Sequence, residues 1–372
     1  MTSDRTAPHR NRITSVQAKI REAGAVAAVI GLSSNLRYLT GFTDEPGERM
    51  LLLIIPSEGE STLVVPELYA EQVRSHRPTA KILTWSDGQD PGDLVEAVAR
   101  DMAAQPGRIL VDDSLWAAMM LPVQRAFSGR EVGLASEVTT ALRMCKSANE
   151  VESMCRAGGI ADRAIEEAIS NPIVGLTELE LAGRLELEML AAGADGIAFE
   201  TLVASGQNSA LPHYRAGNRR IESSDVVIMD FGCQVSGYCS DITRTVVCGE
   251  ANAEVSAVYD SVRAAHAAAV ERVRVGVEAQ EIDRAARSVL TAAGYGGAFN
   301  HRTGHGVGLD IHEPPYMVEG NEIALEIGMA FSIEPGVYFS GSFGVRLEDV
   351  VIVTGGGAKS MTEAPRELRA VE

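Results

Sequence analysis

The segment VVIMDFGCQVSGYCSDITRTVV (226–247) limits most strongly what this chain can fold into. Two β-like runs flank a turn around residues 234–237, and Gly237 can adopt the positive φ that a tight hairpin requires. In a hairpin, the residue numbers of any two directly opposed residues add up to the same value. A turn centred between Val235 and Ser236 therefore predicts that Asp230 lies opposite Asp241.

Two ionised carboxylates in facing positions repel each other, because cross-strand Cβ atoms are only about 4.5–5.5 Å apart. Burying both acids without a cation would be very costly, whereas a divalent cation between them removes the conflict. The sequence therefore suggests a metal site at Asp230 and Asp241. The alternative is that these are two separate polar residues at strand ends.

A second acid-bearing hairpin is predicted in AFSIEPGVYFSGSFGVRLEDVVIV (330–353). A turn centred on Gly341 places Glu334 opposite Glu348, and apolar residues flank both acids. A single glutamate of this kind is by default a solvated surface residue. Two hairpins that each present opposed acids within apolar strands favour a common site.

Histidines gather in one glycine-rich stretch, HRTGHGVGLDIHEPP, which holds His301, His305 and His312. Glycine removes side-chain bulk, so the backbone there can approach a ligand closely. His213 lies upstream in LPHYRAG. Each histidine alone could be an ordinary hydrogen-bonded loop residue, but three within one short stretch favour a site.

The length of 372 residues exceeds what one hydrophobic core usually serves, so we expect two domains. Strand-like and helical stretches alternate in the first part, which predicts an α/β domain over residues 1–144. A long helix begins near Ser147, with Glu150 at capping-box spacing. Strands grouped beside helices then predict an α+β domain over residues 145–372.

Charge and cysteine usage exclude several classes of protein. Lys plus Arg number 33 against 51 for Asp plus Glu, a net charge of −18 that disfavours nucleic acid as a partner. The start of the chain lacks the apolar core of a signal peptide, and the longest apolar run, Met50–Ile55, is too short to cross a bilayer. The five cysteines form no CxxC pair, so we expect a reducing, cytoplasmic location and no membrane partner.

Together these motifs resemble the pita-bread metallopeptidases, a family that includes methionine aminopeptidase, aminopeptidase P and prolidase. The resemblance rests on Asp-x10-Asp, His in TGHGxG, Glu in SIEPG and Glu in RxED, in that order. The first domain resembles the creatinase/prolidase amino-terminal domain through NLRYLTGF (35–42) and LRMCKSANEVE (142–152). The implied fold is an α/β amino-terminal domain followed by an α+β pita-bread catalytic domain.

The resemblance implies a role for each matching residue. Asp230 would bind one metal ion, His305 and Glu334 the other, while Asp241 and Glu348 bridge both. His213 and His312 would contact the substrate and stabilise developing charge, and Glu334 would help to activate water and shuttle a proton. His301 and Arg346 match substrate-side positions of the proline-specific members. Arg346 could instead simply neutralise neighbouring acids.

The function implied is hydrolysis of Xaa-Pro bonds by a hydroxide that two divalent metal ions activate. An oxygen-rich ligand set suits Mn²⁺, with Co, Fe or Zn as other candidates. The substrate would be a small peptide with proline at its second position, and the resemblance suggests a homodimer. Dipeptidase and aminopeptidase P activities stay open, as do a non-peptide amide hydrolase and a non-catalytic peptide-binding module.

Overall fold

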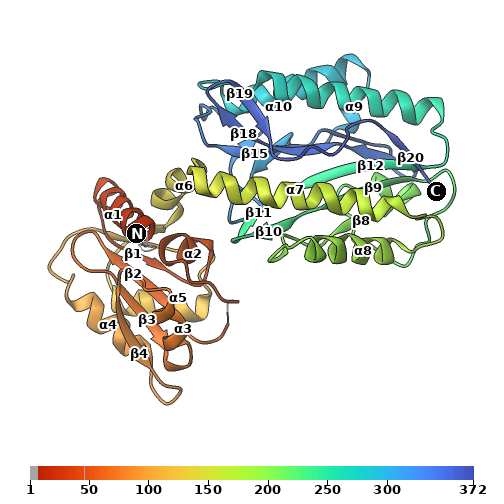
Figure 1. The fold of residues 1–372 in the computed structure, drawn as a ribbon. Coiled ribbons are helices and arrows are strands. Elements are labelled where there is room, and N and C mark those ends of the chain that lie inside the picture. Colours follow the sequence, from red (N-terminus) through yellow and green to blue (C-terminus); the bar gives the residue numbers. More distant parts are fainter. Residues whose placement is uncertain (1–6, 46) are drawn as a thin grey trace, which may run out of the picture. The chain divides into compact units, whose positions relative to one another are not determined.

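The computed structural model describes residues 7–45 and 47–372, and the chain divides into two compact units. The first unit ends at Arg143, and the second runs from Met144 to Glu372. Figure 1 shows both units coloured along the sequence, and each unit is described here by itself.

The first unit is built on a six-stranded sheet with the order β4-β3-β2-β1-β5-β6 (Figure 1). The neighbours β1–β5, β5–β6 and β3–β4 are parallel, while β2 is antiparallel to both β1 and β3. The strands are β1 (Ala25–Ile30), β2 (Leu52–Pro56), β3 (Thr62–Pro66), β4 (Lys81–Trp85), β5 (Arg108–Val111) and β6 (Val132–Leu134).

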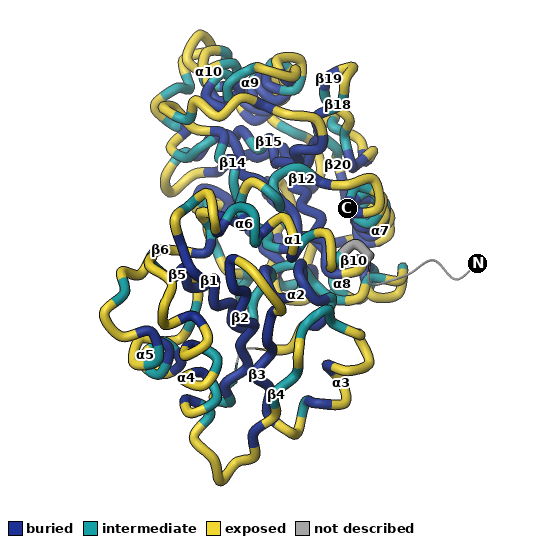
Figure 2. Tube along the Cα trace, turned by 90° about the vertical axis from the view of Figure 1, so that its left-hand side faces the viewer, coloured by how far each residue is buried: buried dark blue, intermediate teal, exposed yellow. Residues whose placement is uncertain are grey.

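Helices cover this sheet and bury its apolar residues. Val29, Leu52 and Ile54 of the sheet pack in one cluster with Val95 of α4 and Val123 of α5. Figure 2 shows β1–β3 almost wholly buried and α4 and α5 exposed on their outer sides. The helices are α1 (Ala7–Glu22), α2 (Ser34–Thr40), α3 (Ala70–Ser75), α4 (Gly92–Arg100), α5 (Ala117–Ala126) and α6 (Ser136–Met144), with a 3-10 turn η1 (Glu67–Tyr69) before α3.

The second unit carries a long sheet with the order β14-β13-β15-β18-β12-β9-β8. Small additional sheets join β11, β10 and β7, and also β16 and β17, while β19 and β20 pair with β18 and β12. The strands are β7 (Gly196–Ile197), β8 (Leu202–Ser205), β9 (Val226–Phe231), β10 (Cys233–Val235), β11 (Tyr238–Cys239), β12 (Ile242–Cys248), β13 (Gly304–Gly306), β14 (Glu313–Met317), β15 (Ala330–Ile333), β16 (Gly336–Tyr338), β17 (Gly344–Arg346), β18 (Glu348–Thr354), β19 (Gly357–Ser360) and β20 (Arg369–Val371).

Two pairs of helices pack against this sheet (Figure 1). At one end, α7 begins after Ser147, whose N–H donates to the Glu150 carboxylate at 2.7 Å, as the capping-box spacing predicts. The helices are α7 (Ala148–Ser170) and α8 (Glu178–Ala191) at that end and α9 (Ala253–Arg272) and α10 (Ala279–Ala292) at the other, with short 3-10 turns η2 (Gly206–Ala210) and η3 (Gly296–Ala298).

The alternation of side chains along the strands decides which residues face away from the helices. In β9, Val227, Met229 and Phe231 pack in the cluster formed with α7 and α8. Successive strand residues point to opposite faces, so Asp230 points away from those helices. In β18, Val351 and Val353 pack under α9 and α10, which places Glu348 on the opposite face by the same rule.

The hairpin of β9–β12 has a register two residues away from the one predicted. Asp230 pairs with Thr243, and Val235 pairs with Tyr238. The turn residues are therefore Ser236 and Gly237, both with positive φ (53° and 81°), as a two-residue hairpin turn requires. The prediction that Asp241 lies directly opposite Asp230 is wrong.

The register of the second acid-bearing hairpin is confirmed. Ile333 pairs with Asp349, and Gly336 pairs with Arg346, so the residue numbers of both pairs add up to the same value. The turn is centred on Gly341, where φ is 75°. Continuing this register by one residue places Glu334 opposite Glu348.

Candidate metal centre and substrate pocket

Asp230 and Asp241 share one face of the first hairpin despite the shifted register. Asp241 lies two residues before Thr243, the cross-strand partner of Asp230, and strand side chains alternate with a period of two. The two acids are therefore diagonal neighbours on the face that points away from the helices. Gly232 lets the strands approach between them, because a Cβ at Gly232 would lie 2.0 Å from the carbonyl oxygen of Ser240.

Glycines also bring His305 close to the neighbouring strands. A Cβ at Gly304 would lie 1.8 Å from the carbonyl oxygen of Ser332, and a Cβ at Gly306 would lie 2.4 Å from that of Glu313. Only glycine therefore fits on either side of His305 at this strand separation. The glycine-rich stretch around this histidine thus serves a close backbone approach, as its sequence predicts.

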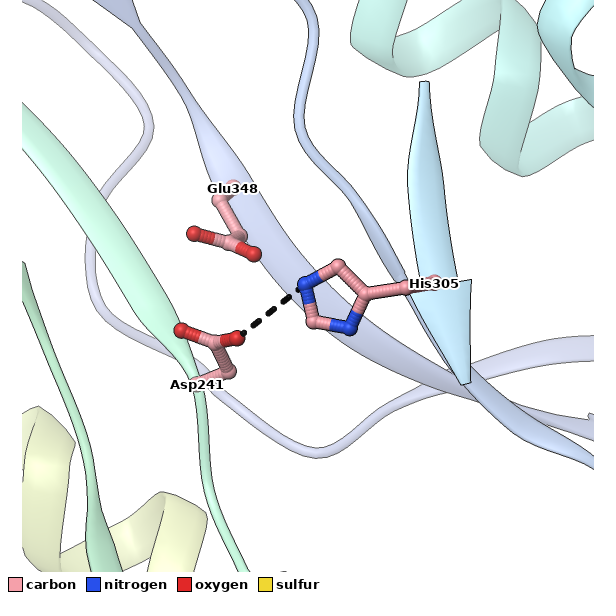
Figure 3. A group of neighbouring side chains, drawn as sticks. All are labelled: Asp241, His305 and Glu348. Carbon is pink, nitrogen blue, oxygen red and sulfur yellow. Dashed lines mark ion pairs between the residues drawn. The ribbon is translucent and has the colours of Figure 1, made fainter. Parts of the chain in front are cut away.

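Donor atoms of Asp241, His305 and Glu348 lie within 4.8 Å of one another, and all three residues are buried. Figure 3 shows the two carboxylates and the imidazole pointing toward a common centre from separate strands. His305 Nε2 lies 3.6 Å from Asp241 Oδ2 and 3.3 Å from Glu334 Oε1. The structure therefore brings together predicted ligands from three distant parts of the sequence.

Burial and mutual repulsion shift the acids of this cluster away from their ordinary pKa values. Burial, followed by the charge of Glu348, raises the pKa of Asp241 well above its usual range. Burial, followed by the charge of Glu334, raises the pKa of Glu348 in the same way, and burial raises the pKa of Glu334 to about 7. The protein alone thus disfavours the ionised form of these acids, which a nearby cation would favour.

His305 presents a neutral ring nitrogen to the acids. Burial lowers the pKa of His305 to about 3, so the ring is uncharged near neutral pH. Its Nδ1 lies 3.2 Å from the carbonyl oxygen of Gly306, which can only accept a hydrogen bond. The proton therefore sits on Nδ1, and Nε2 keeps a lone pair directed at Asp241 and Glu334.

The residues of this cluster fit a divalent metal ion. Among the described residues, Asp230 Oδ1 and Asp241 Oδ1 are buried side-chain oxygens without a hydrogen-bond partner. Such oxygens are costly unless a cation or donor satisfies them. Four carboxylates and one imidazole form an oxygen-rich donor set of the kind that Mn²⁺ and similar ions prefer.

Arg346 lies beside the cluster and contacts Asp230. It is 3 % exposed, and its Nη2 donates to Asp230 Oδ2 at 2.6 Å. Its Nε donates to Thr243 Oγ1, whose hydroxyl in turn donates to Glu348 Oε2 at 2.6 Å. Arg346 therefore neutralises and orients two of the predicted metal ligands, the alternative reading that the sequence left open.

A second chain of hydrogen bonds runs from Arg346 to His301. Arg346 Nη1 donates to the Tyr338 hydroxyl at 2.9 Å, and this hydroxyl lies 3.0 Å from His301 Nε2. His301 Nδ1 lies 2.8 Å from the carbonyl oxygen of Arg302, so Nδ1 carries the proton and Nε2 accepts from Tyr338. Burial lowers the pKa of His301 to about 4, which keeps this ring neutral.

A buried ion pair holds the loop that carries His312. Lys146 Nζ lies 2.7 Å from Glu313 Oε1, and both side chains are almost inaccessible to solvent. The His312 ring packs edge-on against His305 with centroids 4.1 Å apart. Burial lowers the pKa of His312 as well.

A cavity of about 500 Å³ opens above the acid cluster, and all nine predicted site residues line it. That volume lies within the range of small-molecule sites. The further lining residues are Phe199, Glu200, Thr201, Leu202, Pro212, Tyr214, Arg215, Arg302 and Ile311. The sequence patterns assigned none of these nine. Arg215 and Arg302 lie in the two histidine-bearing stretches, so that proximity was the available signal, whereas an apolar wall residue such as Phe199 carries no pattern that separates it from an ordinary core.

Comparisons with known proteins define the class of this chain. Residues 152–355 match the metallopeptidase family M24, and residues 12–145 match the creatinase/prolidase N-terminal domain. The chain therefore belongs to metallopeptidase family M24. The predicted family and its fold, a creatinase-type domain followed by a pita-bread catalytic domain, are confirmed, and membership implies the use of a divalent metal ion.

Individual relatives match almost the whole chain. "Probable dipeptidase PepE" of Mycobacterium tuberculosis is 38% identical over 98% of this chain and 96% of its own. A prolidase structure from Thermococcus sibiricus has a TM-score of 0.94 at 38% identity and covers 98% of this chain and 99% of that one. An Xaa-Pro dipeptidase from Bacillus anthracis has a TM-score of 0.89 at 32% identity and covers 98% and 100%.

Within residues 7–45 and 47–372, no helix is both long enough and apolar enough to cross a bilayer.

Proposed function

We propose that this protein is an Xaa-Pro dipeptidase that uses two divalent metal ions, with Mn²⁺ as the first candidate. The observation that carries the proposal is the convergence of buried acids and one neutral imidazole at the cavity that all the predicted site residues line. The similarity to proteins named dipeptidase, prolidase and Xaa-Pro dipeptidase favours the dipeptidase over aminopeptidase P.

Five residues would hold the metal ions: Asp230, Asp241, His305, Glu334 and Glu348. Bound divalent ions supply Lewis-acid activation of water and of the scissile carbonyl at neutral pH. The contacts to Arg346 and Thr243 hold Asp230 and Glu348 in place for this task.

His213, which precedes the first acid-bearing hairpin, and His312, which follows His305, would both contact the substrate. Both line the cavity, and His312 lies directly against His305. A neutral imidazole near the carbonyl can donate a hydrogen bond to the oxygen on which charge develops. Glu334, also on the cavity wall, would carry the proton to the leaving nitrogen.

Proline explains why such a site is needed. Its amide has no N–H, so a protease that relies on a hydrogen bond from that group loses it. The leaving nitrogen belongs to the pyrrolidine ring and must receive a proton. We propose His301 as a substrate contact at the cavity wall, and Arg346 as the residue that fixes the Asp230 side of the same wall through its buried contacts.

Substrate length separates the dipeptidase from the aminopeptidase. Purified protein loaded with Mn²⁺ is assayed on Ala-Pro and Leu-Pro and on Ala-Pro-Ala-Ala, with release of the first amino acid as the readout. Turnover of the dipeptides with little cleavage of the tetrapeptide supports the proposal. Equal turnover of the longer peptide shows an aminopeptidase, and hydrolysis of N-acyl amino acids alone shows an amide hydrolase of another kind.

Metal dependence is tested on the same preparation. Elemental analysis by mass spectrometry should find divalent metal, and chelation should abolish activity that Mn²⁺ restores. Asp241→Ala and Glu348→Ala should each abolish turnover, while Glu271→Ala, at an exposed position on α9, serves as the matched control. Substantial turnover in either site variant contradicts the assignment, and a protein that holds no metal and cleaves nothing is a binding module.

The remaining expectations belong to the same proposal. We propose a boundary between residues 144 and 145, a homodimer and a cytoplasmic location. Light scattering of the purified protein tests the oligomeric state, and fractionation of the source cells tests the location.

A further inference from the structure

A fully buried carboxylate lies outside the acid cluster, at the first residue of α8. Glu178 is 0 % exposed. Helix capping does not explain its burial, because Thr177 and Glu180 cap this helix through reciprocal hydrogen bonds of 3.1 and 2.7 Å. The Glu178 carboxylate points instead to the segment that follows β8.

Five hydrogen bonds converge on this carboxylate. Glu178 Oε1 accepts from the N–H of Ser205 at 2.8 Å, from the Ser205 hydroxyl at 2.8 Å and from Asn208 Nδ2 at 3.0 Å. Oε2 accepts from the Tyr214 hydroxyl at 2.8 Å and from the N–H of Gly217 at 3.3 Å. A carboxylate has about four lone-pair sites, so its accepting capacity is fully used.

The donors mark the beginning, the middle and the end of one loop. This loop, residues 206–217, follows β8 and supplies Pro212, His213, Tyr214 and Arg215 to the cavity wall. The Asn208 side chain also donates to the Tyr214 hydroxyl at 2.9 Å, which links the first half of the loop directly to its second half. Charge-assisted hydrogen bonds are about twice as strong as neutral ones, so a single carboxylate can hold the whole loop.

Two contacts connect the loop to the residues around the candidate metal centre. The Tyr214 ring packs against the apolar cluster of Leu202, Ile228 and Tyr338. The carbonyl oxygen of Pro212 accepts from Arg346 Nη1 at 3.2 Å. His213 lies between these two anchored residues.

We infer that Glu178 is the positioning residue of the substrate pocket: its buried carboxylate holds the 206–217 loop so that His213 and Tyr214 face the substrate. The inference concerns loop order, and it rests on the proposed function only where activity is measured. A residue that holds a functional side chain in place through hydrogen bonds typically affects activity about 10–100-fold when it is removed.

The variant Glu178→Gln tests the inference, because it keeps the shape and removes the charge. One end of the amide would face donors with another donor, so the loop loses part of its anchor. We expect faster hydrogen–deuterium exchange and faster tryptic cleavage at Arg215 within the loop. We also expect kcat/KM for Xaa-Pro peptides to fall about 10–100-fold, with unchanged metal content because no proposed ligand contacts Glu178.

Glu180→Gln is the matched control, because it weakens the cap of the same helix without touching the loop. If it loosens the loop and slows catalysis as much as Glu178→Gln does, Glu178 acts only through helix stability and the inference fails. The inference also fails if Glu178→Gln folds with native exchange in 206–217 and kinetics within about twofold of the native protein.

Tyr214→Phe and Asn208→Ala keep the test decisive if Glu178→Gln does not fold. Each removes one donor and should increase exchange in the loop by a smaller amount, and unchanged exchange in both contradicts the inference. If the native protein cleaves no Xaa-Pro peptide, the proposed function fails while the exchange and proteolysis data still decide the role of Glu178.

Discussion

The acids of the candidate metal centre predict how the metal-free protein responds to pH. Burial raises the pKa of Asp241 and of Glu348 well above the ordinary range, and that of Glu334 to about 7. A carboxyl whose pKa is higher in the folded than in the unfolded chain binds more protons when folded. Its stabilising effect is present at low pH and is lost as the pH rises through the folded pKa.

The buried histidines act in the opposite sense, but only at lower pH. Burial lowers the pKa of His305 to about 3 and that of His301 to about 4, so both rings stabilise the folded chain increasingly as the pH rises toward the ordinary histidine value. An unfolded histidine is about half protonated at pH 6.5 and almost neutral at pH 7.5, so over this interval each of these rings offsets about 0.3 kcal/mol of the loss that the acids cause. Each carboxyl that stays protonated in the folded chain and is ionised in the unfolded chain lowers the free energy of unfolding by about 1.4 kcal/mol for every unit by which the pH rises. After this offset, the raised pKa values of the three acids give a net loss on the order of 1–2 kcal/mol between pH 6.5 and 7.5.

Urea unfolding at pH 6.5 and 7.5, with EDTA or with excess Mn²⁺, measures this loss. The two tryptophans of the chain, Trp85 and Trp116, belong to the first unit, so their fluorescence provides an internal control while circular dichroism follows both units. The metal-free second unit should be less stable at pH 7.5, and Mn²⁺ should abolish that difference because it keeps the acids ionised. Equal or greater stability of the metal-free second unit at pH 7.5 would refute the reasoning.

Three further variants test the geometry of the site. Gly232→Ala should lower the free energy of unfolding by about 3 kcal/mol and impair metal binding, because the added Cβ would lie 2.0 Å from the carbonyl oxygen of Ser240. A near-native urea midpoint and a native metal content would contradict this expectation. Arg346→Met leaves the half-buried Asp230 without its cationic partner and should destabilise the protein by about 3 kcal/mol in urea unfolding. A cost below about 1 kcal/mol would mean that the ion pair is unimportant for stability. His213→Ala should lower kcat about 10–1000-fold while calorimetry shows native affinity for Mn²⁺, and loss of the metal would mean that its role is misassigned.

Local patterns determined much of the framework. The apolar runs Ala25–Ile30 and Val226–Phe231 form the strands β1 and β9 over their whole length. The register of the second hairpin follows from the glycine at the centre of its turn. The register of the first hairpin was predicted two residues away, yet Asp230 and Asp241 still share a face. Every second side chain of a strand points to the same face of the sheet. A register error of two residues therefore leaves the acids on the predicted face, whereas an error of one residue would move them to the other face.

The sequence by itself pointed to the acids and the imidazole that the structure brings together at the cavity, because strand periodicity and turn chemistry are local and leave their mark in neighbouring residues. Only the tertiary structure decided what surrounds that centre. Arg346 meets Asp230 across 116 positions of sequence, and Lys146 meets Glu313 across 167. Such contacts depend on how strands and loops from distant parts of the chain pack around one cavity, and no local pattern encodes that packing.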